Sequence, residues 1–375
     1  MVSVVQVPDR ISFVESIKSF RVSSDTAISF KLMKGDDVVV NEIYNPDRSG
    51  DVTVDIHDVI SQFLQVKLPS SDVFAQTDGC ASLTALLQDY MLTPSSDFDD
   101  SFDESFGSGF SYTYSFKVLA GGVKGLSDTE DFLLHNWLTW QPQTKTVRGG
   151  QREHLTYYHT GAGDVKIGYY PVDGGERQTA TLHSALEGEY NTYNVSLPYL
   201  LSVIGEDAED VSGVFDLWVE DGAGQRVSWI QRLVFNPDDG TEHYYMAVNS
   251  LGGVDTYCFG GALTLTPAIT HESALVAGRK FSITAGQERV WNQNTGNYPG
   301  AHNAWIWDFV ASGKHWVLKN GAAEEIVVSA SNQQSSDSDS VHVCDFSYSS
   351  AEEAKLNNME RETGSLPVMP VVPMV

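Results

Sequence analysis

Residues 28–32 read ISFKL and residues 165–169 read VKIGY, roughly 140 positions further along the chain. Both segments alternate apolar and polar side chains, as a half-buried β-strand does, and both lead into turns rich in Gly and Asp. In each copy a later strand runs directly into the start of a short helix, at 52–60 (VTVDIHDVI) and at 193–201 (YNVSLPYLL). This tandem repeat predicts two similar β modules in one chain.

Each copy is followed by another alternating strand that ends on glycines, at 112–122 and at 214–224. The strongest hairpin signal is Asp221-Gly222, which lies between two alternating segments. With 32 Gly and 11% aromatic residues, the composition is also typical of sheets joined by many turns. We therefore predict a mainly β protein with tandem β-sandwich-like modules and a smaller α+β C-terminal region.

The length of 375 residues exceeds what one hydrophobic core usually serves. The patterns divide the chain into a first module at 1–122, a second module at 123–265, an α+β region at 266–350 and a terminal segment at 351–375. The first module contains an acidic insertion at about 94–109, whose Ser, Asp and Gly content predicts a mobile loop.

Three segments show helical periodicity. Residues 80–91 place apolar side chains at amphipathic spacing, and residues 302–312 place Trp305 and Phe309 on one helical face. Residues 351–362 also favour a helix, whereas residues 366–375 contain three prolines and predict an extended, apolar end. That end has no evident partner within a domain, so we expect it to dock on a neighbouring subunit.

The formal net charge of −27 disfavours direct contact with nucleic acids and with anionic membranes. Charged residues interrupt the first twenty positions and no run of eighteen apolar residues occurs, so neither a signal peptide nor a membrane span is expected. Cys80, Cys258 and Cys344 are widely spaced, which predicts free thiols and favours neither a disulfide framework nor a zinc site.

The acidic insertion is the sharpest local signal for a ligand. Asp97, Asp99 and Asp103 are possible calcium donors, but the Gly and Glu spacing of an EF-hand loop is missing. A solvated acidic loop is the better interpretation. Aromatic residues recur every four positions there, which suggests docking on a partner: Phe98, Phe102, Phe106 and Phe110.

Other candidate sites are weaker. His154 and His159 are five apart on an expected strand and so face opposite sides, which does not suit a shared metal. Two tryptophan pairs could form a sugar-binding platform, although such residues more often fill a core: Trp137 with Trp140, and Trp305 with Trp307. No motif of a hydrolase, nucleotide-binding or zinc enzyme occurs. We assign no catalytic, cofactor-binding or metal-binding residue.

Four short segments carry a family resemblance: residues 8–13 (PDRISF), 54–60 (VDIHDVI), 248–256 (VNSLGGVDT) and 294–296 (NTG) ahead of Trp305. In these the chain resembles tail-associated structural proteins of tailed bacteriophages and of prophages of gut bacteria. The resemblance implies a virion protein near the tail tip or baseplate that acts by assembly. It supplies no catalytic residue, and the acidic insertion and proline-rich end depart from the pattern.

The expected function is therefore a virion structural protein, made in the host cytoplasm, that binds other virion proteins and copies of itself without a cofactor. The alternative is a carbohydrate-binding adhesin or receptor-binding module that uses one of the tryptophan pairs. A weaker third possibility is a hydrolase of bacterial surface glycans, which would need an aromatic cleft holding two carboxylates.

Overall fold

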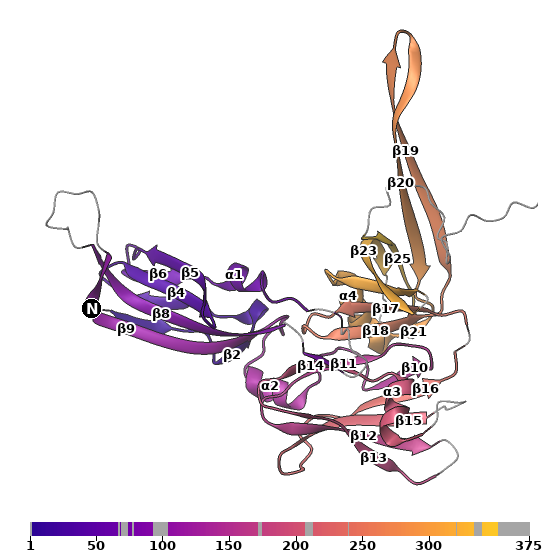
Figure 1. The fold of residues 1–375 in the computed structure, drawn as a ribbon, viewed down its shortest axis with the longest axis horizontal. Coiled ribbons are helices and arrows are strands. Elements are labelled where there is room, and N and C mark those ends of the chain that lie inside the picture. The colour runs from indigo at the N-terminus through magenta and orange to yellow at the C-terminus, as the bar shows by residue number, and fades with distance from the viewer. Residues whose placement is uncertain are drawn as a thin grey trace, which may run out of the picture.

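The computed structural model describes residues 2–66, 68, 74–76, 79–92, 104–171, 175–206, 213–238, 240–319, 321–333 and 340–351. The protein is mainly β, as predicted, with two sandwich-like modules and a third region from which a long hairpin projects (Figure 1). Three predicted features lie outside the described residues: the carboxylates Asp97, Asp99 and Asp103, the helix beyond Ala351, and the proline-rich end at 366–375.

The first module combines a small and a large sheet. The small sheet has the order β1 (Ser3–Gln6), β3 (Phe20–Ser23), β6 (Asp51–Val54), and the large sheet has the order β2 (Ile11–Phe13), β9 (Glu104–Leu119), β8 (Cys80–Leu92), β4 (Ile28–Lys34), β5 (Asp37–Tyr44). Short turns of helix are η1 (Val14–Ser16) and α1 (His57–Ser61). The alternating apolar residues, among them Phe20 and Phe30, form one buried core.

The second module repeats this plan. Its large sheet has the order β10 (Thr144–Arg148), β16 (Gln231–Asn236), β15 (Gly213–Asp221), β12 (Gly163–Pro171), β13 (Gln178–Ala185), and its small sheet has the order β11 (His154–Tyr158), β14 (Tyr190–Asn194), β7 (Phe74–Gln76). The helices are α2 (Thr129–His135) and α3 (Leu197–Ile204). Helix α3 starts with a proline in its first turn and stops at Gly205, whose φ of 82° suits a glycine.

Strand pairing confirms the internal repeat. In both large sheets the first two strands in spatial order, β2 with β9 and β10 with β16, are parallel, and the remaining pairs are antiparallel. The strand-to-helix step is also shared, from β6 to α1 and from β14 to α3. The two modules differ in their small sheets. Strand β7 belongs to the first module by its place in the sequence, but it pairs with β14 of the second module.

The third region is built on one seven-stranded sheet. Its order is β18 (Val254–Phe259), β17 (His243–Val248), β22 (His315–Lys319), β23 (Ala322–Gln333), β25 (Cys344–Ser350), β20 (Arg279–Asn294), β19 (Leu263–Val276). Helix α4 (Asn303–Ala311) covers it, with η2 (Gly300–His302) and the small pair β21 (Tyr298–Pro299) and β24 (Val341–His342) alongside. Its core is rich in aromatic side chains, including Tyr245, Tyr257 and Phe309.

Three predictions differ from the structure. The acidic insertion at about 94–109 is not a loop throughout, because residues 104–109 begin strand β9 and residues 104–106 pair with β8. The helix over 80–91 is wrong: the segment is strand β8, whose Ala81, Leu83 and Ala85 are buried while Ser82 is exposed. Its apolar residues fit both periods, and pairing with β4 and β9 decides for the strand. The boundary at 265 falls inside β19, because β17 and β18 join the seven-stranded sheet and not the second module.

Candidate functional site: the projecting arm and its junction

Strands β19 and β20 form a long antiparallel hairpin, residues 263–294, which we call the arm. Pairing runs from Leu263 opposite Gln293 to Val276 opposite Arg279. The two turn residues, Ala277 and Gly278, have φ of 49° and 76°. Positive φ at both central residues is the geometry of a tight hairpin turn that matches the natural twist of two strands. The arm therefore closes on itself without help from the rest of the chain.

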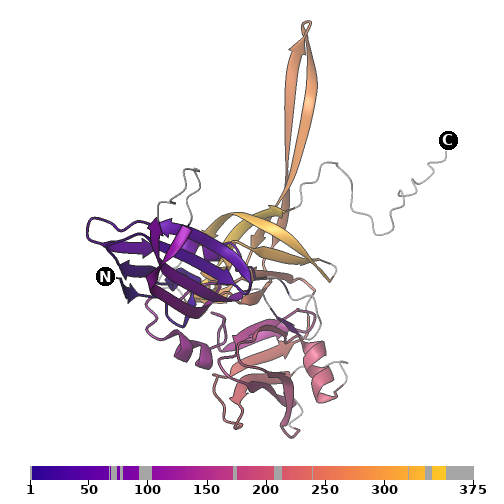
Figure 2. The same cartoon turned by 60° about the vertical axis from the view of Figure 1, so that its left-hand side comes forward.

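Only the base of the arm belongs to the larger sheet. Pairing of β20 with β25 is confined to Trp291–Asn294. There the Trp291 ring stacks on Tyr348 with centroids 5.5 Å apart, and the Lys319 ammonium lies 4.4 Å from the Trp291 ring centroid. Gln293 Nε2 donates to the Gly261 carbonyl at 3.0 Å. Beyond this anchor the ribbon rises away from both modules (Figures 1 and 2).

The tip of the arm exposes apolar side chains. Leu275 is 74% exposed, Val276 57% and Phe281 51%. Large apolar residues clustered at the end of a projection, and not scattered singly, are typical of a contact surface. An isolated two-stranded ribbon is also marginally stable in water, so a partner strand or surface would stabilise it.

Residues 249–253, between strands β17 and β18, form a loop that contacts other regions of the chain. Asn249 organises this loop, because its Oδ1 accepts hydrogen bonds from the amides of Leu251 and Gly253 at 3.0 and 2.8 Å. Its Nδ2 donates to the carbonyl of Leu138, in the second module, at 2.8 Å. We call residues 249–253 the junction loop.

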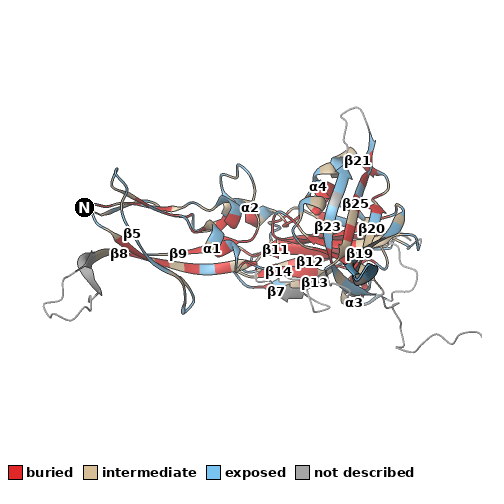
Figure 3. Ribbon diagram, turned by 90° about the horizontal axis from the view of Figure 1, so that it is seen from above, coloured by how far each residue is buried: buried red, intermediate tan, exposed pale blue. Residues whose placement is uncertain are grey.

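The junction loop also contacts the first module and helix α4. Ser250 accepts from the amide of Gly122 at 2.8 Å through its carbonyl, and its own amide donates to Asp308 Oδ2 at 2.9 Å. A Cβ on Gly253 would lie 2.1 Å from the Leu138 carbonyl oxygen, so only glycine fits there. One loop thus joins all three regions. Strands β11 and β14 of the second module are almost entirely buried (Figure 3).

A buried ion pair reinforces the same junction. Lys145 Nζ, on β10, donates to Glu153 Oε1 at 2.6 Å and to the carbonyl of Thr256, on β18, at 2.6 Å. Lys145 is 3% exposed and Glu153 is 0% exposed. The Lys145 ammonium also lies 4.9 Å from the centroid of the Trp305 ring on α4. Burial raises the pKa of Glu153, and the adjacent Lys145 opposes that rise.

Asp255 is the second buried carboxylate of the junction. It is 1% exposed, and its Oδ2 accepts from Trp305 Nε1 at 3.1 Å. Burial raises the pKa of Asp255 to about 7, against the lowering effect of hydrogen bonds from Thr139 and of the charge on Lys145. A strongly perturbed group of this kind can mark a reactive centre or a structural network. Here Asp255 is a buried residue of strand β18 that accepts a hydrogen bond from Trp305 of helix α4.

The structure splits both predicted tryptophan pairs. Trp137 and Trp305 are 1% and 8% exposed and belong to the core, whereas Trp140 and Trp307 are 42% and 54% exposed. Trp305 and Trp307 lie on helix α4, where residues two apart face different sides, so the two rings do not form one platform. Trp140 Nε1 donates to Ser250 Oγ at 2.7 Å.

The two histidines and the three cysteines lie apart. His154 begins β11 and His159 follows its end; both are buried, and burial lowers the pKa of each to about 4. His159 Nε2 lies 2.7 Å from Tyr193 Oη. Cys80, Cys258 and Cys344 are all free thiols. Among the described residues no group of three His, Cys, Asp or Glu side chains is placed to hold a metal ion.

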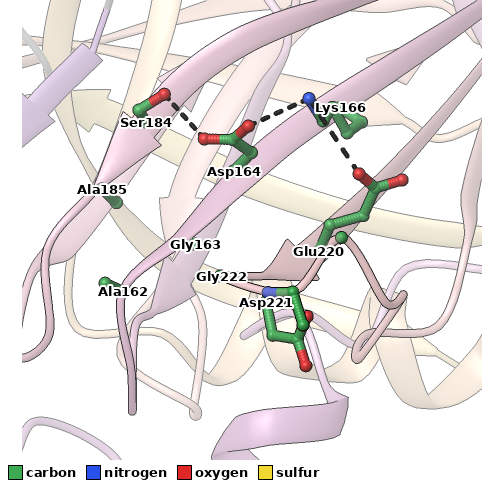
Figure 4. A pocket seen from close by; sticks show the side chains of 11 residues that line it. Ala162, Gly163, Asp164, Lys166, Ser184, Ala185, Glu220, Asp221 and Gly222 are labelled. Carbon is green, nitrogen blue, oxygen red and sulfur yellow. Dashed lines mark hydrogen bonds and ion pairs between the residues drawn. The ribbon is translucent and has the colours of Figure 1, made fainter.

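One open hollow of about 550 Å³ lies at an end of the second module's large sheet. Its lining includes Asp164, Lys166 and Glu220, and Figure 4 shows Lys166 between the two carboxylates. Lys166 Nζ is 2.9 Å from Asp164 Oδ2 and 4.0 Å from Glu220 Oε2. Hydrogen bonds from Ser184 and Lys166 lower the pKa of Asp164. The lining contains no aromatic residue, so this hollow does not match the cleft that the hydrolase interpretation requires.

No protein-family model matches the chain, and no curated protein matches it either. In the part of the chain that the structure describes, no helix combines the length and apolar character needed to cross a membrane. Sequence reasoning missed the arm, because the exposed positions of Leu275 and Phe281 follow only from the projection of the hairpin.

Proposed function

We propose that this protein is a structural component of a bacteriophage virion, in the tail or baseplate, that acts through protein–protein contacts. The observation that carries the proposal is the arm: a ribbon that pairs with the body only at its base and presents Leu275, Val276 and Phe281 to solvent. The junction loop adds support, since it makes the three regions a continuous base for that arm. The resemblance to tail-associated proteins suggests the particle in which this contact is used.

The test is to purify particles of the phage or induced prophage that encodes the chain and to label them with antibodies against the arm. We expect mass spectrometry to detect the chain in the purified particles. Once the tail is partly dissociated, electron micrographs should show the antibody label at one end of the tail. A chain abundant in the lysate but missing from purified particles would overturn the proposal.

Carbohydrate binding is the second candidate function. The exposed rings of Trp140 and Trp307 favour it, because an aromatic face in water can stack on a sugar ring. A glycan array probed with the full-length protein, and with Trp140→Ala and Trp307→Ala variants, tests this function. Binding that one variant abolishes supports it, and an array without hits for the folded protein removes it.

A further inference from the structure

The arm has an unpaired edge. From 279 to 290, β20 pairs only with β19, and no other described strand lies beside it. The opposite edge belongs to β19, which contains Pro267 and so lacks one amide donor, whereas β20 contains no proline. The edge of β20 is therefore the better template for an added strand.

The arm also differs from the rest of the chain in charge. Residues 263–294 contain three basic residues and two acidic ones, a formal charge of +1, so the remaining residues carry −27 − 1 = −28. Arg279 and Lys280 lie at the tip, next to the exposed Phe281. Within the described residues neither cation has a carboxylate at ion-pair distance. A basic, apolar tip on an acidic chain favours an acidic partner.

A matching edge exists in the first module. Strand β5 is the last strand of its sheet, eight residues long, with Val38 50% and Ile43 44% exposed. Residues 35–47 around it contain acidic side chains, including the exposed Asp37 and Glu42, and no Lys or Arg. Long exposed apolar edges invite pairing with another strand, and negative charge on such an edge selects against strands of the same sign.

We infer that β20 in the arm of one copy pairs with β5 of a second copy of this chain. The inference rests on the proposed function and names the partner for its contact surface. The unpaired stretch of β20, 279–290, is longer than β5, so the whole edge strand can be covered. Main-chain hydrogen bonds supply affinity in such strand addition, and the side chains supply specificity.

The contact must join two molecules. The arm rises from the third region and away from the sheet that contains β5 in both views (Figures 1 and 2). A surface on one copy that binds a different surface on the next is heterologous, and repeated copies then close into a ring or extend into a filament. This architecture suits a multi-copy component of a tail.

Photo-cross-linking of the full-length protein tests the contact directly. Benzoylphenylalanine at position 281 replaces one aromatic ring by a similar one, and the same group at the 69% exposed position 186 is the matched control. We expect cross-links from position 281 to residues 35–47 of another copy, and none there from position 186. Cross-links from position 281 to other segments only, or to no second copy, overturn the inference.

A charge exchange provides a second test that does not depend on cross-linking. Arg279→Glu combined with Lys280→Glu should raise the concentration for half-maximal association about tenfold or more at low salt. Mixing this variant with copies carrying Asp37→Lys and Glu42→Lys should restore association. The β20–β5 contact is contradicted if the charge reversal on the arm leaves association unchanged. It is also contradicted if the reversal weakens association and the mixture does not restore it.

The two proposals fail in different ways. Particles that contain the protein, combined with cross-links from position 281 to another virion protein, would refute the self-association and leave the virion role intact. Cross-links between β20 and β5, combined with the absence of the protein from purified particles, would refute the virion role and leave the self-association intact.

Discussion

The arm and the junction loop are neighbours in sequence but opposite in physical character. The junction, at residues 249–253 with Lys145, Glu153 and Asp255, is buried, polar and held by contacts from three regions. The arm, at residues 263–294, has an exposed tip and pairs almost entirely with itself. Substitutions should therefore separate the two: the junction determines the stability of the fold, and the arm determines association.

The largest expected loss of stability follows from removal of the buried Lys145 cation. Lys145→Met leaves Glu153 buried without its partner, and breaking such a pair costs about 3–5 kcal/mol. Denaturant unfolding of the full chain measures this change. The matched control is Lys18→Met, whose pair with Asp9 is more than half exposed on both sides and should contribute less than about 1 kcal/mol. Equal losses in the two variants would contradict the assignment of the junction.

The second effect is a pH dependence. The pKa of Asp255 rises from 3.8 to about 7 on folding, so the folded protein holds this proton more tightly than the unfolded chain. Its stabilising contribution is complete below pH 3.8 and is lost as the pH rises through about 7. Relative to Asp255→Asn, the wild type should lose up to about 4 kcal/mol across that range.

The comparison with Asp255→Asn isolates this group. His154 and His159 have pKa values lowered to about 4, and they destabilise the fold as the pH falls from 6.5 towards that value. Both proteins contain these histidines, so their contribution cancels in the difference. Parallel curves of unfolding free energy against pH would show that Asp255 titrates normally.

The third effect is steric. Gly253→Ala places a methyl group 2.1 Å from the Leu138 carbonyl oxygen, which the backbone must move to accommodate, at a cost of about 2 kcal/mol or more. Gly260→Ala, with no atom within 4 Å of its added Cβ, should change stability by less than about 0.5 kcal/mol. Thermal unfolding of both variants checks this contrast. If the two variants unfolded alike, the loop would not be a close junction.

The smallest effect on stability belongs to the arm. Leu275→Ser and Phe281→Ser alter side chains that are 74% and 51% exposed, so the free energy of unfolding should change by less than about 0.5 kcal/mol. Association, measured by mass photometry, should weaken in the same variants. A large stability loss would instead mean that the arm contributes to the fold of its own chain.

Local patterns predicted much of the secondary structure. Alternation located β4, β11 and β12, and the strand-to-helix steps at 52–60 and 193–201 are β6–α1 and β14–α3. The repeat also predicted two modules of one plan, which the matching strand orders confirm. Residues 80–91 were mistaken for a helix because their apolar positions suit either period until neighbouring strands are in place.

The candidate site was less accessible to prediction. Nothing local in residues 248–256 indicates that Asn249 would bond to Leu138 or Ser250 to Asp308. Trp305 and Trp307 looked equivalent in the sequence, but helix α4 buries one and exposes the other.

The sequence alone determined where strands and turns form, that the plan occurs twice and that the chain is strongly acidic, because these depend on side chains close together along the chain. Only the tertiary structure decided that β7 crosses to the second module, that β17 and β18 join the third region and that the arm stands free. Strand partners are chosen by hydrogen bonds and burial between distant segments, and one alternating pattern is compatible with many such partners.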